Sequence, residues 1–152
     1  MNYWLLKTEP NEFSIDDLQA LGPGIEPWDG IRNYQARNIL RDDIKKGDLA
    51  FIYHSSCKLV GVAGVAKVVE EAYPDPAQFN PKSKYYDPKS TKETPRWVCI
   101  GVTFVERFKE VIPLAEIKQI PSLSAMVLVN RGRLSVQPVR PDEWNTIMDM
   151  KE

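Results

Sequence analysis

The segment from Leu59 to Val69 most constrains the fold, because it is a long strand-like run that two glycines interrupt. Most of its apolar residues are valines, which favour a pleated and half-buried strand. Gly61 and Gly64 lie inside this run. A glycine within a strand is typical of a bulge or a sharp bend, and a small barrel needs such bends at its corners. The segment therefore predicts a strongly bent sheet.

The other strands and helices are short and alternate along the chain. Runs of branched and aromatic residues predict further strands at residues 2–8, 49–55, 96–108 and 135–139. Ser14 with Asp17 predicts a capped helix that ends near Leu21, and Asn33 predicts the cap of a second helix that ends near Arg41. Further helices are expected at residues 114–118 and 141–150, whereas residues 123–129 fit a helix or a strand equally well. The pattern predicts one α+β domain over residues 1–152, with a mixed sheet flanked by helices.

Composition limits the class of protein. The chain has 152 residues, of which 43% are hydrophobic and 27% are charged, as in an ordinary globular domain. We expect no transmembrane helix and no signal peptide, since no apolar stretch is long enough. Cys57 and Cys99 are expected to be reduced core thiols in a cytoplasmic protein. The net charge of −1 argues against a protein that coats nucleic acid, so any nucleic-acid contact is expected to be local.

The run from Pro27 to Asn38, PWDGIRNYQARN, is the strongest functional signal in the chain. Trp28 lies in a turn bounded by proline and glycine, where a large ring either joins the core or lines a pocket. Asp29, Arg32 and Asn33 place a carboxylate, a guanidinium and an amide nearby. A ring for stacking beside polar groups for an edge suits a nucleobase. These residues alone support equally a Trp28 pocket and a core Trp28 with Asp29 as a turn cap.

Several motifs, taken together and in order, resemble the EVE domain family. They are Tyr3–Pro10, Trp28–Asn38, Gly47–Ser55, Pro74–Pro76 with Tyr85–Lys89, and Leu134–Val139. The resemblance implies a PUA-like fold, which is an open, strongly bent mixed β-barrel flanked by short helices. It also implies a relation to the YTH-type readers of N6-methyladenine. The implied function is non-catalytic recognition of a modified base, such as a methylated or hydroxymethylated one, in DNA or RNA, without a cofactor or metal.

The resemblance adds two strand ends to the Trp28 pocket. Lys7 and Thr8 end the first strand, where the related readers have the floor of the site and contact the nucleic-acid backbone. Tyr53, His54 and Ser55 end the strand at residues 49–55. A histidine there can stack on a base, and a serine can bind a base edge or a phosphate. The alternatives are a lysine in a surface ion pair and a rim histidine without a role.

Residues 73–95 form a long polar loop, and loops of this length are usually functional or disordered. Aromatic residues alternate with lysines there, as a cradle for a flipped base requires. Tyr85 and Asp87 are the candidate ligand contacts. The alternative is a solvated loop whose aromatic residues pack on the barrel. Arg131 and Arg133 are candidate phosphate contacts as well, although solvated turn residues explain them better.

An enzyme acting on a base or nucleoside is a second hypothesis, and a protein-interaction domain is a third. One histidine and two distant cysteines give no zinc set of the usual spacing, and the chain has no glycine-rich phosphate loop or nucleophile elbow. Asp29 with His54 could perform acid–base chemistry, but a third partner is not recognisable. The sequence favours a base reader in which Trp28 stacks on the base, the Tyr85–Lys89 loop closes over it, and Arg32 helps to bind phosphate.

Overall fold

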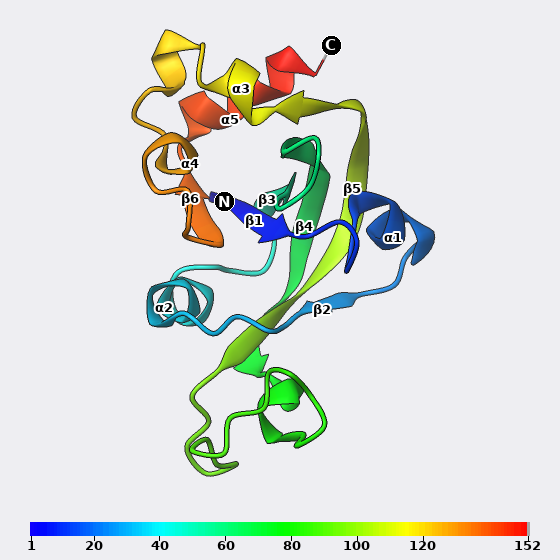
Figure 1. The fold of residues 1–152 in the computed structure, drawn as a ribbon, viewed down its shortest axis with the longest axis vertical. Helices are drawn as coiled ribbons and strands as arrows, with labels where there is room; N and C mark the ends of the chain where they lie inside the picture. The colour runs from blue at the N-terminus through cyan, green and yellow to red at the C-terminus, as the bar shows by residue number, and fades with distance from the viewer. Residues whose placement is uncertain (152) are drawn as a thin grey trace.

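The computed structural model of the protein describes residues 1–151 and contains one six-stranded mixed sheet. The strand order is β2-β5-β4-β3-β1-β6 (Figure 1). The strands are β1 (Tyr3–Thr8), β2 (Glu26–Trp28), β3 (Leu49–His54), β4 (Gly61–Pro74), β5 (Val98–Pro113) and β6 (Val136–Val139). β1 and β3 are parallel, and the other neighbouring pairs are antiparallel. The sheet does not close into a barrel, because β2 and β6 remain its two edges; the predicted α+β class with an open mixed sheet is confirmed.

Short helices flank this sheet. They are α1 (Ile15–Ala20), α2 (Tyr34–Asp42), α3 (Leu114–Ile117), α4 (Val127–Asn130) and α5 (Pro141–Met150), with the 3-10 turns η1 (Pro76–Phe79) and η2 (Pro121–Leu123). Both predicted caps are confirmed. Ser14 and Asp17 form a capping box before α1, and the Asn33 side chain accepts a hydrogen bond from the Ala36 N–H before α2. Residues 123–129, which fitted a helix or a strand equally well, contain the end of η2 and the first three residues of α4. These elements are too short to give a clear hydrophobic period.

β4 and β5 bend where the sequence places glycine. The register of their ladder shifts between Val62 and Gly64. A Cβ atom on Gly64 would lie 2.3 Å from the carbonyl oxygen of Glu106, so only glycine lets the two backbones approach this closely. Of the bulge or bend predicted at these glycines, the bulge is therefore confirmed. Both strands continue beyond their predicted ends, to Pro74 and Pro113. These ends are paired in the β4–β5 ladder, and a hydrophobic pattern does not reveal such pairing.

Hydrophobic side chains pack on both faces of the sheet. Along β3, Ala50 and Ile52 belong to one core cluster, whereas Phe51 and Tyr53 belong to the other, because neighbours along a strand point to opposite faces. The first cluster includes residues of α1 and α2, and the second includes residues of α3, α4 and α5. In the second cluster, the Trp144 ring stacks on the Phe51 ring with their centroids 3.8 Å apart. Both faces of the sheet are thus occupied by core.

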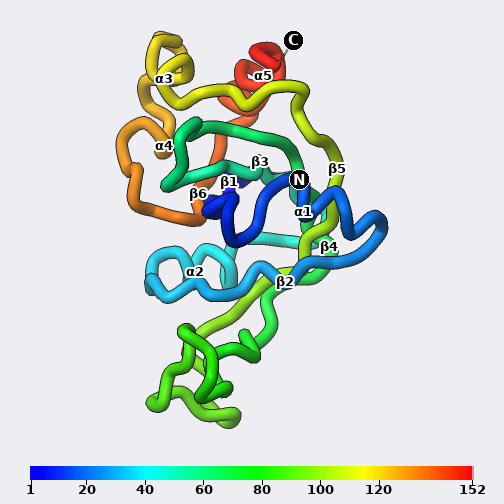
Figure 2. Tube along the Cα trace, turned by 45° about the vertical axis from the view of Figure 1, so that its right-hand side comes forward, coloured from blue at the N-terminus to red at the C-terminus, as the bar shows by residue number. Residues whose placement is uncertain are grey.

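Residues 75–97 connect β4 and β5 and project from the end of the molecule opposite α3 and α5 (Figure 2). The predicted loop is confirmed, although it contains η1 and begins and ends two residues later than predicted. Cys57 and Cys99 are both free thiols; Cys99 is buried and Cys57 is half-buried. Across residues 1–151, none of the helices has the length and apolar character that crossing a membrane requires.

Candidate functional site

A cleft of about 580 Å³ opens between β2 and the ends of β1 and β3. It is lined by residues 7–9, 12–13, 26–32, 55–56, 84–85, 132–133 and 135. These segments are distant in the sequence, and they come from both ends of the strand order. Of the expected ligand contacts, the cleft brings together Lys7, Thr8, Trp28, Asp29, Arg32, Ser55 and Tyr85.

Trp28 is both a core residue and a wall of this cleft. It ends β2 opposite Ile100 and is only 6% exposed. Phe13, which also lines the cleft, meets its ring edge-on, with centroids 6.0 Å apart and planes at 84°. The indole N–H of Trp28 donates to no residue in the described chain, whereas the indole groups of Trp4 and Trp97 donate to carboxylates. Trp28 therefore combines the two alternatives, because it is a core residue that also lines the cleft.

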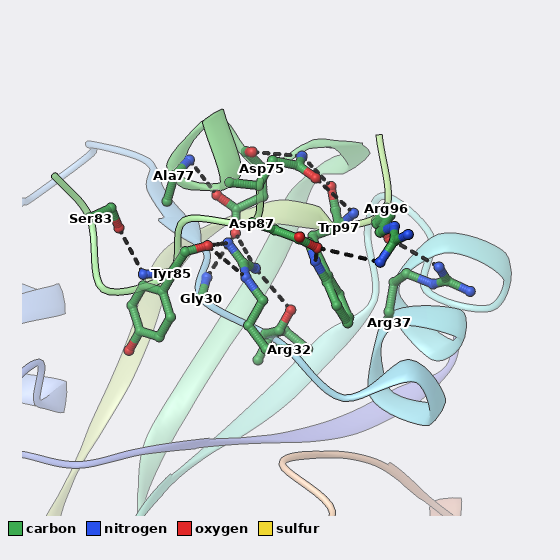
Figure 3. Close-up of polar contacts among 12 residues, drawn as sticks. Gly30, Arg32, Arg37, Asp75, Ala77, Ser83, Tyr85, Asp87, Arg96 and Trp97 are labelled. Atoms are coloured by element: carbon green, nitrogen blue, oxygen red, sulfur yellow. Dashed lines mark hydrogen bonds and ion pairs between the residues drawn. The ribbon is translucent and has the colours of Figure 1, made fainter. Parts of the chain in front are cut away.

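Asp75 fixes the loop that follows Trp28. Its fully buried carboxylate accepts hydrogen bonds from the N–H groups of Gly30 and Ala77, at 2.9 and 2.8 Å, and from Nη1 of Arg32 at 3.0 Å (Figure 3). Arg32 also donates from Nε and Nη2 to the carbonyl oxygen of Tyr85, at 3.0 and 2.8 Å. These contacts join the Trp28 loop to the segment between β4 and β5. The structure therefore directs the Arg32 donors toward the protein, and not toward the expected phosphate.

The Tyr85 ring packs directly on the backbone of Gly30. Gly30 has a φ of +79°, which favours glycine, and a Cβ atom there would lie 2.8 Å from the Tyr85 ring. Lys84 pairs with Glu12 across the sequence, so the loop is also joined to the segment that follows β1. Tyr85 thus forms part of the cleft wall in the conformation that the structure describes, without a further closing movement.

One wall of the cleft carries two carboxylates without a partner residue. Within residues 1–151, the side chains of Glu26 and Asp29 form no ion pair and no hydrogen bond with another residue, although the backbone N–H of Asp29 contacts its own carboxylate. Burial, followed by the charges of Asp29 and Asp17, raises the pKa of Glu26. Burial and the charge of Asp75 raise the pKa of Asp29, against the opposing effects of its own backbone N–H and of Arg32. Both groups therefore hold their charge at some cost in free energy.

The opposite wall carries a cation. Lys7 donates from Nζ to the carbonyl oxygen of Gly132, and Nζ lies 5.2 Å from the centroid of the Tyr53 ring. Burial lowers the pKa of Lys7. Arg133 and Ser135 line the same side. The cleft thus has acceptors on one wall and a donor on the other.

Two expected contacts on β3 do not reach this cleft. Tyr53 is 2% exposed and belongs to the second core cluster, beneath Lys7. His54 accepts a hydrogen bond at Nε2 from the N–H of Ile15, 3.1 Å away, and lines a different cleft. Alternation along a strand sends neighbours to opposite faces, so Tyr53, His54 and Ser55 cannot all face one ligand.

Two expected contacts on other segments serve the fold. Asn33 caps α2 and lines a smaller hollow beside the cleft. Asp87 accepts a hydrogen bond from the indole N–H of Trp97 at 2.8 Å, and this bond lowers the pKa of Asp87. Neither residue lines the cleft at Trp28.

Sequence reasoning missed Glu26, Phe13 and Asp75. Glu26 lies two residues before Trp28, so recognition of β2 as a strand would have placed both on one face. Asp75 lies in the Pro74–Pro76 motif. Its structural role depends on hydrogen bonds from Gly30 and Arg32, which are more than forty positions away in the sequence.

Comparison with known proteins agrees with these motifs. The model of the EVE domain matches residues 2–150. Human thymocyte nuclear protein 1 is 43% identical over 168 residues, which cover 99% of this chain and 74% of that protein. A solved Pseudomonas syringae protein superposes with a TM-score of 0.94 at 48% identity and covers 99% of both chains. The human THYN1 protein in complex with 5-methylcytosine containing DNA superposes with a TM-score of 0.94 at 42% identity, covering 100% of this chain and 98% of that one. This chain therefore belongs to the EVE domain family.

Proposed function

We propose that this protein is a non-catalytic module, formed by residues 1–152 as one domain, that recognises a modified base in DNA through the cleft at Trp28. The observation that carries the proposal is the cleft itself, in which an indole ring, two carboxylates and a lysine surround a space of about 580 Å³. Ligand pockets of this kind typically measure about 300–1,000 Å³. A base taken out of its stack fits such a space.

The relative solved with DNA supports the choice of ligand. That human protein was crystallised with DNA that contains 5-methylcytosine, and it aligns with this chain over its full length. We extend this ligand class to the present cleft, with Trp28 as the stacking surface. Stacking of a base on an aromatic ring contributes about 1–3 kcal/mol. The net charge of −1 fits binding that depends on the base more than on the phosphate backbone.

The arrangement of polar groups supports binding over catalysis. Asp29 and His54, the pair that acid–base chemistry would require, line two different clefts. Nε2 of His54 is engaged by the Ile15 N–H, which makes it unavailable as a base. RNA as an additional ligand, and a cytoplasmic location, remain parts of the proposal; the human relative is named as a nuclear protein.

The test compares Trp28→Phe with Trp144→Phe. Both tryptophans are nearly buried, at 6% and 5% exposure, but Trp144 lies in the second core cluster, away from the cleft. Binding to a fluorescent oligonucleotide with one 5-methylcytosine is measured by anisotropy, and folding by thermal unfolding. We expect Trp28→Phe to weaken binding roughly tenfold, within the range of one stacking interaction, and Trp144→Phe to leave it unchanged.

Two results would contradict the proposal. One is equal affinity of wild type and Trp28→Phe for the modified oligonucleotide, with both proteins folded. The other is equal affinity of the wild type for cytosine and 5-methylcytosine. Phenylalanine is chosen because alanine at a buried tryptophan costs about 3–5 kcal/mol of stability, which would confuse folding with binding.

A further inference from the structure

We infer that Glu26 and Asp29 make this cleft selective for a base with an exocyclic amino group, such as cytosine, over a base with an oxo group at the same position, such as thymine. The inference rests on the proposed function and adds to it the chemical class of the base. It concerns the C4 substituent of a pyrimidine, which is independent of the methyl group at C5.

The two carboxylates are placed to meet a ligand beside Trp28. Glu26 and Trp28 are two residues apart on β2 and therefore share one face of the strand, and Asp29 follows directly. All three line the cleft. Glu26 is half-buried and Asp29 is exposed, whereas the nearby Asp75 is fully buried and accepts three hydrogen bonds. Within the described chain, Glu26 and Asp29 thus keep lone pairs that a ligand can use.

An ionised carboxylate accepts hydrogen bonds and donates none. The C4 amino group of cytosine is a donor, whereas O4 of thymine is an acceptor. A carboxylate that meets the amino group forms a charge-assisted hydrogen bond. A carboxylate that meets O4 is left unpaired and repels the oxygen. Sites built on such a hydrogen bond reject the analogue that lacks the donor far more strongly than a site rejects a missing methyl group.

The facing wall completes the match. Lys7 carries only donors, and it lies at the end of β1 on the side of the cleft that holds Gly132 and Arg133. Cytosine has an amino donor at one end of its pairing edge and the acceptors N3 and O2 toward the other. The cleft matches this order, because Glu26 and Asp29 can accept from the amino group on one wall and Lys7 can donate to N3 or O2 from the other. Adenine has a similar order, with its amino group next to N1, so the selected class is the amino bases.

The electrostatic state of the empty cleft agrees with this assignment. Burial raises the pKa of both Glu26 and Asp29, with the charges of Asp29 and Asp17 adding to the effect on Glu26 and the charge of Asp75 adding to that on Asp29, so both charges are incompletely compensated in the free protein. Two donor hydrogens from an amino group offer that compensation. An oxo base offers none.

The experiment varies the methyl group and the amino group separately. Four DNA duplexes differ only in one base, which is 5-methylcytosine, thymine, cytosine or uracil. This base is placed opposite an abasic site, so that no difference in pairing energy contributes. The comparison of 5-methylcytosine with thymine, and of cytosine with uracil, tests the amino group. The comparison of 5-methylcytosine with cytosine, and of thymine with uracil, tests the methyl group and thus the proposed function.

We expect the wild type to bind each amino base roughly tenfold more tightly than its oxo counterpart, which is the scale of one hydrogen bond to a charged group. In Asp29→Asn and Glu26→Gln, the new amide can donate to O4, so this ratio should fall toward one. Glu9→Gln is the matched control, because it removes the same charge at the exposed rim of the cleft. It should change all four affinities by the same factor and preserve the ratio.

The outcomes separate the two claims. A preference for 5-methylcytosine over cytosine with equal binding of thymine overturns the amino-group inference and leaves the proposed function intact. Equal binding of 5-methylcytosine and cytosine, with both favoured over the oxo bases, supports the inference and overturns modified-base reading. An amino preference that survives in both Asp29→Asn and Glu26→Gln overturns the assignment of these residues.

Discussion

Two pairs of acidic residues show how differently this protein uses its carboxylates: Asp48 and Asp75 are buried, whereas Glu26 is half-buried and Asp29 is exposed. Asp48 accepts hydrogen bonds from the N–H groups of Asn2 and Lys45 and from the indole of Trp4. Asp75 accepts three as well, including that of Arg32. Glu26 and Asp29, on the cleft wall, have no such partners within residues 1–151 and have raised pKa values.

The difference separates the residues that hold the fold from those available to a ligand. A buried polar group that has its hydrogen bonds contributes to stability, whereas one without them reduces it. Asp75 accepts a hydrogen bond from the N–H of Gly30, the residue that follows Asp29, so the two kinds of carboxylate lie in the same local structure. The anchored group positions Trp28, and the unpaired groups lie beside it.

The largest effect is expected from removal of the anchor. Asp75→Ala takes away three hydrogen bonds and leaves the partly buried Arg32 guanidinium without its carboxylate. We expect a loss of about 3–5 kcal/mol in the free energy of unfolding, measured in urea, because removing one partner of a buried ion pair leaves the other charge uncompensated inside the protein. Asp142→Ala is the control, since it removes an exposed ion pair with Arg140, and solvent-exposed pairs contribute little to stability. Similar losses in both variants would contradict the distinction.

A smaller effect concerns His54, which is another buried group with an internal partner. Its Nε2 accepts from the Ile15 N–H, and burial lowers its pKa from the ordinary value of 6.5. Because the folded pKa is the lower one, the contribution of neutral His54 to stability is present above about pH 6.5 and is lost as the pH falls through the folded pKa.

His54→Gln keeps an acceptor for the Ile15 N–H but does not titrate. Between pH 7 and pH 5, we expect the wild type to lose about 1 kcal/mol more than this variant, which is the scale of one buried hydrogen bond. The measurement is urea unfolding at several pH values. If the free energy of unfolding depends on pH in the same way in both proteins, the hydrogen bond from the Ile15 N–H is not linked to protonation of His54.

The smallest effect should have the opposite sign. Asp29→Asn removes a charge whose pKa is raised in the folded state. Such a group favours the folded state fully below its unfolded pKa, and this contribution is lost as the pH rises through the folded value. After allowance for screening by solvent, we expect the variant to be about 0.5 kcal/mol more stable than wild type at pH 7 and equal to it near pH 3.

Asp87→Asn tests the contrast within the same measurement. The hydrogen bond from Trp97 lowers the pKa of Asp87, so loss of this carboxylate should reduce stability at pH 7. Destabilisation by Asp29→Asn, with the protein folded, would mean that Asp29 is a structural group like Asp75.

The sequence predicted the local features of the fold better than the long-range ones. Caps such as Ser14 and Asn33 depend on residues three positions away, and glycines such as Gly64 mark a backbone constraint directly. β2 has only three residues and pairs with β5, which lies about seventy positions later, so no local pattern reveals it.

The same limit explains the result for the candidate site. Trp28, Asp29 and Lys7 could be proposed because their motifs are recognisable in the sequence, and the structure brings them to one cleft. The roles of Arg32 and Asp87 could not, because each is decided by a partner from another segment, at Asp75 and Trp97. His54 was misplaced in the pocket because its direction depends on the pleat of β3.

The open sheet has a consequence for control of binding. β2, which carries Trp28, has a sheet partner on one side only, and the cleft lies between it and the end of β1. Trp28 and Lys7 are therefore not joined by a direct strand ladder, because the path between their strands in the sheet runs through β5, β4 and β3. Under the proposed function, anything that draws these two strands together, whether a crosslink, a neighbouring molecule or the ligand, would strengthen binding without changing the residues proposed to select the base. Affinity and base selection could then be adjusted separately.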